Sequence, residues 1–230
     1  MLTIGLPRAM LYYRYRELWK TYFDCLGVQT VTSEPTTRAT LERGAALSVD
    51  ETCLSARVWF GHVDSLIGRC DALFVPRVAS LGPRQTMCTR FMGLPDLTRQ
   101  VFRHSGVKVY DCNVDVNDRH SEQDAYIQLG ADMGFTVKQA RQAWHEAVRA
   151  DEKAWRQRVT ENEKLYRAEG IRVILAAHSY VYEDAWIGRP VVDFLRVMGV
   201  TVIPADVVDR KQALRRSAQL SPTLRWQMSR

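Results

Sequence analysis

The sequence predicts an α/β protein of two lobes, each built on a parallel, doubly wound sheet flanked by helices. Short apolar segments alternate with longer stretches of helical period, a pattern that favours βαβ units. The 230 residues suffice for one large domain or two small ones. A hydrophobic fraction of 46% with 25% charged residues is typical of a globular chain with a buried core.

The first lobe is expected over residues 1–115. Its strands are predicted at residues 2–7, 28–31, 71–76 and 107–111, and its helices at 9–26, 36–47, 54–66 and 96–105. Thr52 suits the N-cap of the third helix, and Pro95 suits the first turn of the fourth. A loop is expected between residues 76 and 96. Each strand is thus followed by a helix that returns to the sheet.

A helical connector (116–170) and a second lobe (171–230) are expected to follow. The second lobe shows two strands, 171–177 and 201–206, joined by a helix over 185–198. Two parallel strands cannot cover their own faces, so this lobe is predicted to be incomplete. The missing strands would come from a homo-oligomer, a partner subunit or a downstream segment. Alternatively, residues 209–230 fold back as a helix and cap the open edge.

The cysteine pattern and the charge limit the classes of protein. The five cysteines form no Cys-x-x-Cys pair, and the chain shows no secretory signal, which favours the reducing cytoplasm. No apolar run approaches the ~20 residues of a membrane span. The net charge of +6 indicates a solvated basic face or an acidic partner, and no nucleic-acid-binding signature is present.

Several polar residues follow predicted strand ends, where ligands bind in open parallel sheets. Arg8, Arg77, Cys88 and Cys112 occupy such positions. Cys53 stands at the start of a predicted helix, where the helix dipole favours a thiolate. Three cysteines from distant positions are therefore candidates for a cluster held by thiolates from loops.

Buried packing is the alternative explanation for every cysteine, because cysteine often behaves as a small hydrophobic residue. Cys25 and Cys70 are predicted to be buried packing residues. His62 lies in a predicted helix and is more typical of a core histidine, whereas His178 at a strand end suits a site or the core equally. The sequence contains no dinucleotide-binding fingerprint, no P-loop and no nucleophile elbow.

Seven short segments occur in a specific order along nearly the whole chain. They are Ile4-Gly-Leu-Pro-Arg-Ala9, Asp50-Glu-Thr-Cys-Leu54, Phe60-Gly-His-Val63, Phe74-Val-Pro-Arg77, Cys88-Thr-Arg-Phe-Met-Gly-Leu-Pro-Asp96, Ala177-His-Ser-Tyr180 and Gly199-Val-Thr-Val-Ile-Pro204. Together they resemble the 2-hydroxyacyl-CoA dehydratase activase-related proteins. That family is similar to the iron–sulfur subunits of 2-hydroxyacyl-CoA dehydratases and benzoyl-CoA reductases.

The resemblance implies an iron–sulfur cluster, of the 4Fe–4S type, with Cys53 and Cys88 as ligands. Cys112, a partner or an exogenous group would supply the third ligand, and Arg8, His62 and Arg77 would be neighbours of the cofactor. The chain departs from the family pattern where Ser55, Thr89 and Ser179 replace usual prolines.

The implied function is the handling of single electrons for acyl-CoA chemistry in an anaerobic cytoplasm, with electrons delivered by an ATP-dependent activase. Catalysis by the chain itself is left open, and no catalytic residue is assigned. The alternative is a non-catalytic, partner-binding or scaffold lobe without a working cluster. A third interpretation is a small-molecule binding module in which Arg8 and Arg77 clamp a phosphate.

Overall fold

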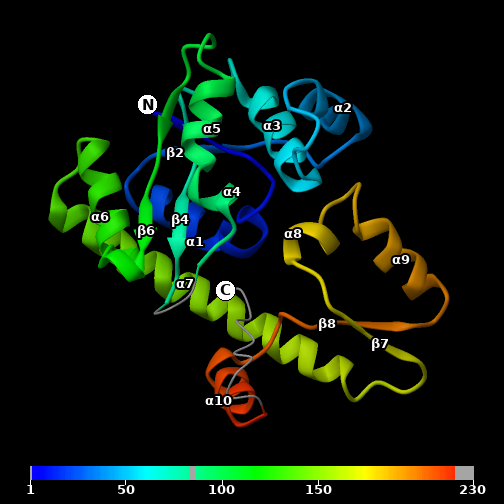
Figure 1. The fold of residues 1–230 in the computed structure, drawn as a ribbon. Coiled ribbons are helices and arrows are strands. Elements are labelled where there is room, and N and C mark those ends of the chain that lie inside the picture. Colours follow the sequence, from blue (N-terminus) through cyan, green and yellow to red (C-terminus); the bar gives the residue numbers. More distant parts are fainter. Residues whose placement is uncertain (1, 83–85, 221–230) are drawn as a thin grey trace. The chain divides into compact units, whose positions relative to one another are not determined.

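The computed structural model describes residues 2–82 and 86–220 and confirms the predicted α/β class with parallel sheets (Figure 1). The chain divides into two compact units, Met1–Ala150 and Asp151–Arg230, which we call unit 1 and unit 2. Each unit is described by itself below. Residues 221–230, part of the predicted second lobe, lie outside the described residues. Among the described helices, none is both long and apolar enough to span a membrane.

Unit 1 is built on a four-stranded parallel sheet. The strands are β1 (Thr3–Leu6), β2 (Gln29–Thr32), β3 (Ala72–Phe74) and β5 (Lys108–Tyr110), in the spatial order β2-β1-β3-β5. All four coincide with predicted strands. The first strand of the chain therefore lies inside the sheet, with a neighbour on each edge.

The predicted helices of unit 1 are confirmed, with one correction. Four of them are α1 (Tyr12–Cys25), α2 (Arg38–Ala46), α3 (Leu54–Leu66) and α5 (Leu94–Val101). The helical connector expected over 116–170 contains two helices, α6 (Glu122–Asp132) and α7 (Val137–Leu165). Gly134 separates them with φ of 91°, a left-handed conformation that glycine adopts readily.

Three short elements in unit 1 were not predicted. They are β4 (Arg77–Ser80), α4 (Thr89–Met92) and β6 (Asn113–Asp115). β4 and β6 pair in parallel and continue the ladder of β3 and β5, because Val75 N donates to Tyr110 O and Arg77 N donates to Cys112 O. A 3₁₀ turn, η1 (Val116–Asp118), follows β6. Pro76 interrupts the strand pattern, which concealed the continuation from sequence reasoning.

Aromatic side chains fill the core of unit 1 where α1 covers the sheet. Phe74 of β3 lies against both Trp19 and Phe23, at ring-centroid distances of 5.2 and 5.3 Å. Tyr22 lies edge-to-face with Tyr126 of α6 at 5.1 Å. These edge-to-face contacts add to the stabilisation from apolar burial. The Phe74 side chain of β3 thus fixes α1 on the sheet.

Glycines let α2 and α3 approach at backbone distance. A Cβ on Gly44 would lie 1.8 Å from Arg57 O, and one on Gly61 would lie 2.0 Å from Thr40 O. No other residue fits at either position without moving a backbone. These contacts hold α3 against α2, and Cys53 lies at the start of α3.

Unit 2 contains two described strands, β7 (Arg172–Leu175) and β8 (Thr201–Pro204), which pair in parallel. The helix predicted over 185–198 is shorter, α9 (Arg189–Val197), because Pro190 favours a helix start. A separate turn, α8 (Ser179–Tyr182), precedes it, and α10 (Arg210–Leu220) follows β8. Buried Tyr182, Val192 and Val202 form the core of unit 2, with Leu175, Ala177 and Leu195 packed around them.

The C-terminal half of α7 is anchored to the segment after β8. Asn162 Nδ2 donates to Pro204 O at 3.0 Å and to Val207 O at 2.8 Å. Trp155 Nε1 donates to Val208 O at 3.3 Å. Buried side-chain donors that satisfy loop carbonyls hold this segment against α7.

Candidate functional site

Several residues that the sequence singled out lie in the segments that follow the strands of the unit 1 sheet. All four strands are parallel, so each connection leaves the carboxyl edge of the sheet and returns to the opposite edge, and the connection from β2 to β3 contains two helices, α2 and α3. Arg8 follows β1, and Cys53 and Cys88 each immediately precede a helix that leads back toward the next strand. Topology therefore places Arg8 at the carboxyl edge and puts Cys53 and Cys88 in the connections that leave this edge.

Arg8 is anchored to the end of β2. Its backbone N–H donates to Ser33 Oγ at 2.8 Å, and its Nε donates to Ser33 O at 3.0 Å. Ser33 is fully buried. Sequence reasoning missed Ser33, although a small polar residue directly after a strand is a usable signal. The guanidinium is thereby oriented at the edge, where such a group suits an anionic ligand.

The loop between β1 and α1 contains a backbone outlier. Met10 has φ of 50°, which is uncommon for a residue with a Cβ, and its side chain is buried. Such conformations cost of the order of 1–3 kcal/mol and gather at functional loops. Nothing in the sequence indicated this residue. The strain lies two positions after Arg8 and belongs to the same edge.

Cys53 is the N-cap of α3, with φ of −62° and ψ of 152°, and its side chain is exposed. Thr52, the predicted cap, is buried one position earlier. Arg57 ties the preceding segment to the helix, because its Nε donates to Thr52 O at 2.9 Å and its Nη2 donates to Asp50 O. The thiol is therefore held at the positive end of a helix of 13 residues.

Cys88 is the N-cap of α4 and is also exposed. Its carbonyl accepts from Phe91 N at 2.9 Å, which starts the helical turn. Arg77 braces this segment from β4, since its Nη1 donates to Met92 O at 2.7 Å and its Nη2 pairs with Asp96 at 2.5 Å. The hydrogen bond from Arg77 holds the pKa of the Asp96 carboxyl below its ordinary value.

His62 lies in the interior of α3, where its side chain is 1% exposed. Its Nε2 is 2.9 Å from Thr36 Oγ1, on the segment that follows β2. Thr36 is buried as well. The pair links α3 to the loop at the end of β2, which is the arrangement of a hydrogen-bonded core histidine.

Cys112 differs from the two exposed cysteines. It is 2% exposed, and burial is the largest cause that raises the pKa of its thiol, followed by the nearby Asp111 and Glu122. A hydrogen bond with the Tyr126 side chain opposes part of that rise. The environment therefore favours the protonated thiol, which is a poor metal ligand.

The two cysteines predicted to be packing residues behave differently from one another. Cys25, at the end of α1, is exposed, so the prediction of a buried residue is wrong for it. Burial, Glu146 and Asp24 nevertheless raise the pKa of its thiol. Cys70 is half-buried, and its Sγ donates to Leu66 O at 3.3 Å. Neither thiol stands at a helix N-terminus.

The donor set fits thiolate ligation only in part. Within residues 2–82 and 86–220, no three His, Cys, Asp or Glu side chains gather closely enough to hold a metal ion. Cys53 and Cys88 have the chemistry and exposure of cluster ligands. A complete 4Fe–4S site needs more ligands than these two described residues provide.

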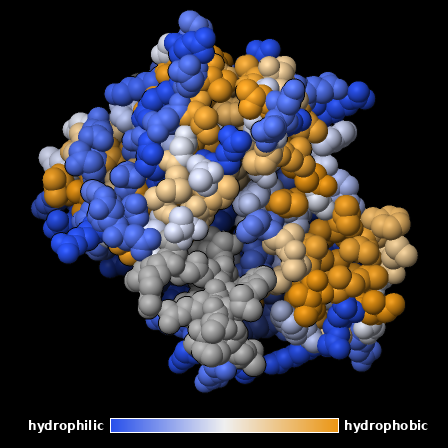
Figure 2. Space-filling model, in the orientation of Figure 1, coloured by the Kyte–Doolittle hydropathy of each residue, from blue (hydrophilic) through white to orange (hydrophobic). Residues whose placement is uncertain are grey.

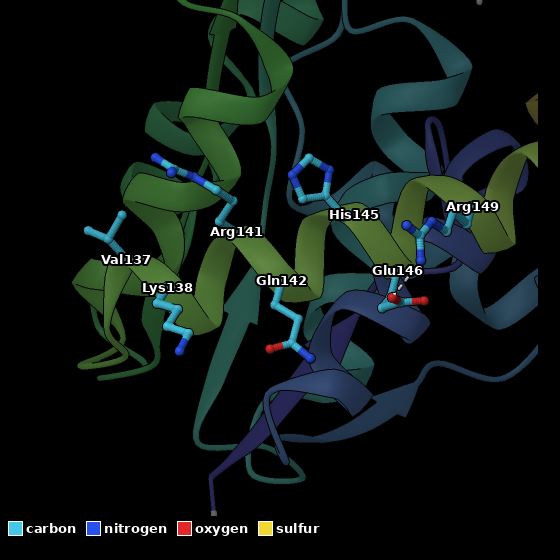
Figure 3. A pocket seen from close by; sticks show the side chains of 7 residues that line it. All are labelled: Val137, Lys138, Arg141, Gln142, His145, Glu146 and Arg149. Atoms are coloured by element: carbon cyan, nitrogen blue, oxygen red, sulfur yellow. Dashed lines mark hydrogen bonds and ion pairs between the residues drawn. The ribbon is translucent and has the colours of Figure 1, made fainter.

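A second surface feature lies along the N-terminal half of α7. A shallow concavity of about 590 Å³ is lined by Val137, Lys138, Arg141, Gln142, His145, Glu146 and Arg149. Figure 3 shows Arg141 and His145 on one side of the helix and Lys138 and Gln142 on the other. Glu146 pairs with Arg149 at 2.9 Å. Because the side chains diverge, this is a basic helix face rather than a pocket for a small ligand.

Polar side chains also gather at the carboxyl ends of the unit 2 strands. Tyr182 Oη donates to Asp206 Oδ1 at 2.9 Å, and Arg158 pairs with Glu183 beside them. Burial raises the pKa of the Asp206 carboxyl, and the bond from Tyr182 opposes that rise. His178, which the sequence left between site and core, is exposed and stacks on Tyr180. Asp206 was missed as a site residue, although it is the last residue of the strand predicted over 201–206.

One of three comparisons with known proteins gives a match. The family model described as "CoA enzyme activase uncharacterised domain" matches residues 3–208, which is most of the chain. No curated protein and no solved structure matches the chain.

Proposed function

Because this chain belongs to the family described as CoA enzyme activase uncharacterised domain, we propose that it handles single electrons in a CoA enzyme system. Cys53 and Cys88 are two thiolate ligands of an iron–sulfur cluster that another polypeptide completes. The observation that carries the proposal is that these two cysteines, and no other described ones, are exposed N-cap residues.

The helix starts supply the physical reason. The first backbone N–H groups of a helix have no partner inside it and favour negative charge nearby. A thiolate at Cys53 gains this stabilisation from α3, and the shorter α4 offers free N–H groups beside Cys88. Cys25 gains none, because it stands at the opposite end of α1.

Ligands from a partner fit the remaining chemistry. Burial raises the pKa of the Cys112 thiol, and no three His, Cys, Asp or Glu side chains gather as a ligand group among the described residues. The bound cluster would supply or accept one electron. This chain's own residues orient the two thiolates, and Arg8 offers a cation for an anionic group such as those of an acyl-CoA.

Anaerobic reconstitution with iron and sulfide tests the proposal. Iron, acid-labile sulfide and visible absorbance are measured per chain for the wild type, Cys53→Ser and Cys88→Ser. The matched control is Cys25→Ser, which removes an exposed thiol away from any helix N-terminus. We expect the two site variants to lose most of the iron and the control to retain it.

A cadmium titration extends the test to a chain without its partner. Two cooperating thiolates bind Cd²⁺ tightly and give a ligand-to-metal absorption band. Either site variant should abolish the tight phase, and Cys25→Ser should not. Equal iron and equal cadmium binding in all four proteins would contradict the assignment of Cys53 and Cys88.

A second candidate function is a partner-binding lobe without a cluster. It rests on the burial of Cys112, which withholds one of the three candidate cysteine ligands. Under this alternative, the protein stays colourless and iron-free after reconstitution in the presence of its partner, and Cys53→Ser and Cys88→Ser assemble normally. Iron content therefore separates the two functions.

A further inference from the structure

Strand β7 has one paired edge and one free edge. Thr201 N donates to Ile171 O, and Ala205 N donates to Leu175 O. Peptide groups alternate direction along a strand, so residues 171, 173 and 175 face β8. The backbone groups of Arg172 and Ile174 face the other edge, where no described strand pairs with them. A free parallel edge is a template for another strand.

Both faces of β7 are also uncovered. Val173 and Ile174 point to opposite faces of the sheet and are 36% and 61% exposed, respectively. Their neighbours across the ladder on β8, Val202 and Ile203, are 2% and 1% exposed. Parallel strands are normally covered on both faces. The uncovered region of this sheet is therefore confined to the side of β7.

Unit 1 contains the same arrangement with the free edge filled. Gln29 N donates to Leu2 O and Ser33 N donates to Leu6 O, which is the pattern found between β8 and β7. β1 and β7 therefore correspond, with Thr3 equivalent to Arg172. On β1, the remaining edge is occupied by β3, whose Asp71 N donates to Thr3 O.

Unit 1 also shows what covers the following helix. Gly27 and Gly199 both adopt left-handed φ just before the second strand of their units. Counted back from these glycines, Trp19 corresponds to Val191 and Tyr22 to Phe194. Trp19 is 1% exposed because it packs on Phe74 of β3, whereas Val191 is 57% exposed.

The uncovered face of α9 continues beyond Val191. Its exposed apolar residues are Val191, Phe194, Val197 and the adjoining Met198. Figure 2 shows the broad hydrophobic area over this helix. Contiguous apolar surface of this kind marks an interaction site. In unit 1, the corresponding helix face is covered by the strand in the β3 position and by α6.

We propose that the free edge of β7 docks an apolar strand of a partner polypeptide, which adds in parallel to β7 as β3 adds to β1. The strand's backbone pairs with Arg172 and Ile174. A large apolar side chain in the position of Phe74 lies opposite Leu175 and covers Val191 on α9.

One difference between the units specifies the partner further. Gly5 of β1 corresponds to Ile174, and a Cβ on Gly5 would lie 2.7 Å from Cys70 Sγ and 2.9 Å from Leu73 Cδ2. In unit 1, Cys70, just before β3, and Leu73, within β3, occupy this space. Ile174 fills the same space in unit 2, so the partner strand needs a small residue or a turn there. This inference goes beyond the cluster proposal and involves neither Cys53 nor Cys88.

A synthetic peptide is the probe. It copies residues 70–76 of this chain, with Cys70 replaced by serine and Leu73 by alanine to leave room for Ile174, and the control peptide also carries aspartate in place of Phe74. Amide hydrogen exchange of the full chain is measured with millimolar peptide. We expect the Arg172 and Ile174 amides to slow at least tenfold with the copy and not with the control. A spin label at the peptide N-terminus should broaden Arg172 more than Leu175, as parallel pairing requires.

Two proline variants make the test specific for the free edge. Ile174→Pro removes an N–H that points away from β8, so the β7–β8 ladder survives and strand addition is lost. Val173→Pro removes an N–H that points toward β8 and should disrupt the hydrogen bonds between β7 and β8. Retention of slow exchange at Val173 and Leu175 shows that the Ile174→Pro protein is folded.

The proposal is overturned if Ile174→Pro binds the peptide as the wild type does, or if the peptide protects neither amide. Stronger broadening of Leu175 than of Arg172 would indicate antiparallel pairing and would contradict the geometry taken from unit 1. A dimer by light scattering that Ile174→Pro converts to a monomer would assign the edge to a second copy and overturn the separate partner. Cys53→Ser and Cys88→Ser should bind the peptide normally. The peptide result therefore does not depend on whether the cluster proposal is correct.

Discussion

β1 and β7 begin their units in the same way and end in different environments. Each pairs in parallel with the next strand of the chain, in the same register. The apolar residues of β1 are fully buried, whereas Ile174 of β7 is 61% exposed. The difference lies in β3, which pairs with the second edge of β1 and carries Phe74 into the core. A βαβ unit thus forms from local pattern, but a further strand must complete its sheet.

The largest expected effect is the contrast between corresponding residues on α1 and α9. Trp19→Ala should lower the free energy of unfolding by about 3–5 kcal/mol, because it empties a packed site against Phe74. Val191→Ala should change it by less than about 0.5 kcal/mol, as for other exposed residues. Peptide-resolved hydrogen exchange of the two helices measures both. Equal losses would mean that the α9 face is already covered.

The next contrast uses Gly5 and Ile174. Gly5→Ala places a methyl group into Cys70 and Leu73 and should destabilise unit 1 by about 1–3 kcal/mol. Ile174→Ala removes an exposed side chain and should cost less than about 0.5 kcal/mol. Denaturant titration followed by exchange in each unit separates the two effects. A larger loss for Ile174→Ala would contradict the free face of β7.

A smaller, pH-dependent effect is expected at the carboxyl end of β8. Burial raises the pKa of Asp206 in the folded chain, so the folded state binds this proton more tightly than the unfolded state does. The resulting stability is present below the ordinary value of 3.8 and is lost as the pH rises through the raised value. Asp206→Asn should therefore gain stability relative to the wild type over that window. A constant difference across the pH series would refute the shift.

The smallest effect is expected for the brace beside Cys88. Arg77→Met breaks the pair with Asp96, which is largely exposed, so the cost should stay within about 1 kcal/mol. The loss of the bond to Met92 O should still loosen the segment that carries Cys88. Thiol labelling of Cys88 should accelerate while labelling of Cys53 stays constant. Unchanged labelling of both would show that Arg77 does not position α4.

Periodicity predicted the long elements well, because strands such as β1 and helices such as α1 are recognisable from the pattern of neighbouring residues. It missed β4 and β6, since Pro76 breaks the pattern and both strands are short. It joined α6 and α7, because a glycine such as Gly134 is compatible with a helix until its φ is known. Closure of the unit 2 sheet depends on contacts between distant segments, which periodicity does not encode.

The rule that ligands bind beyond strand ends pointed to Arg8, Cys53 and Cys88, and their convergence on one site stays a prediction. Cys112 differs from the two exposed cysteines because it is buried, and Arg77 is hydrogen-bonded to Asp96. A single sequence specifies neither the burial of Cys112 nor the partner of Arg77. Cys25 was misjudged because its helix is amphipathic and its position lies at the border of the buried face.

Residue-resolved amide exchange on the full chain, without any added peptide, tests the comparison most directly. The ladder directs the Gly5 amide at β3 and the corresponding Ile174 amide at the free edge of β7. Gly5, Val173 and Leu175 should exchange slowly, and Ile174 should exchange at nearly the rate of an unstructured peptide. Protection of Ile174 equal to that of Gly5 would contradict the account, because it would mean that the second edge of β7 is already paired.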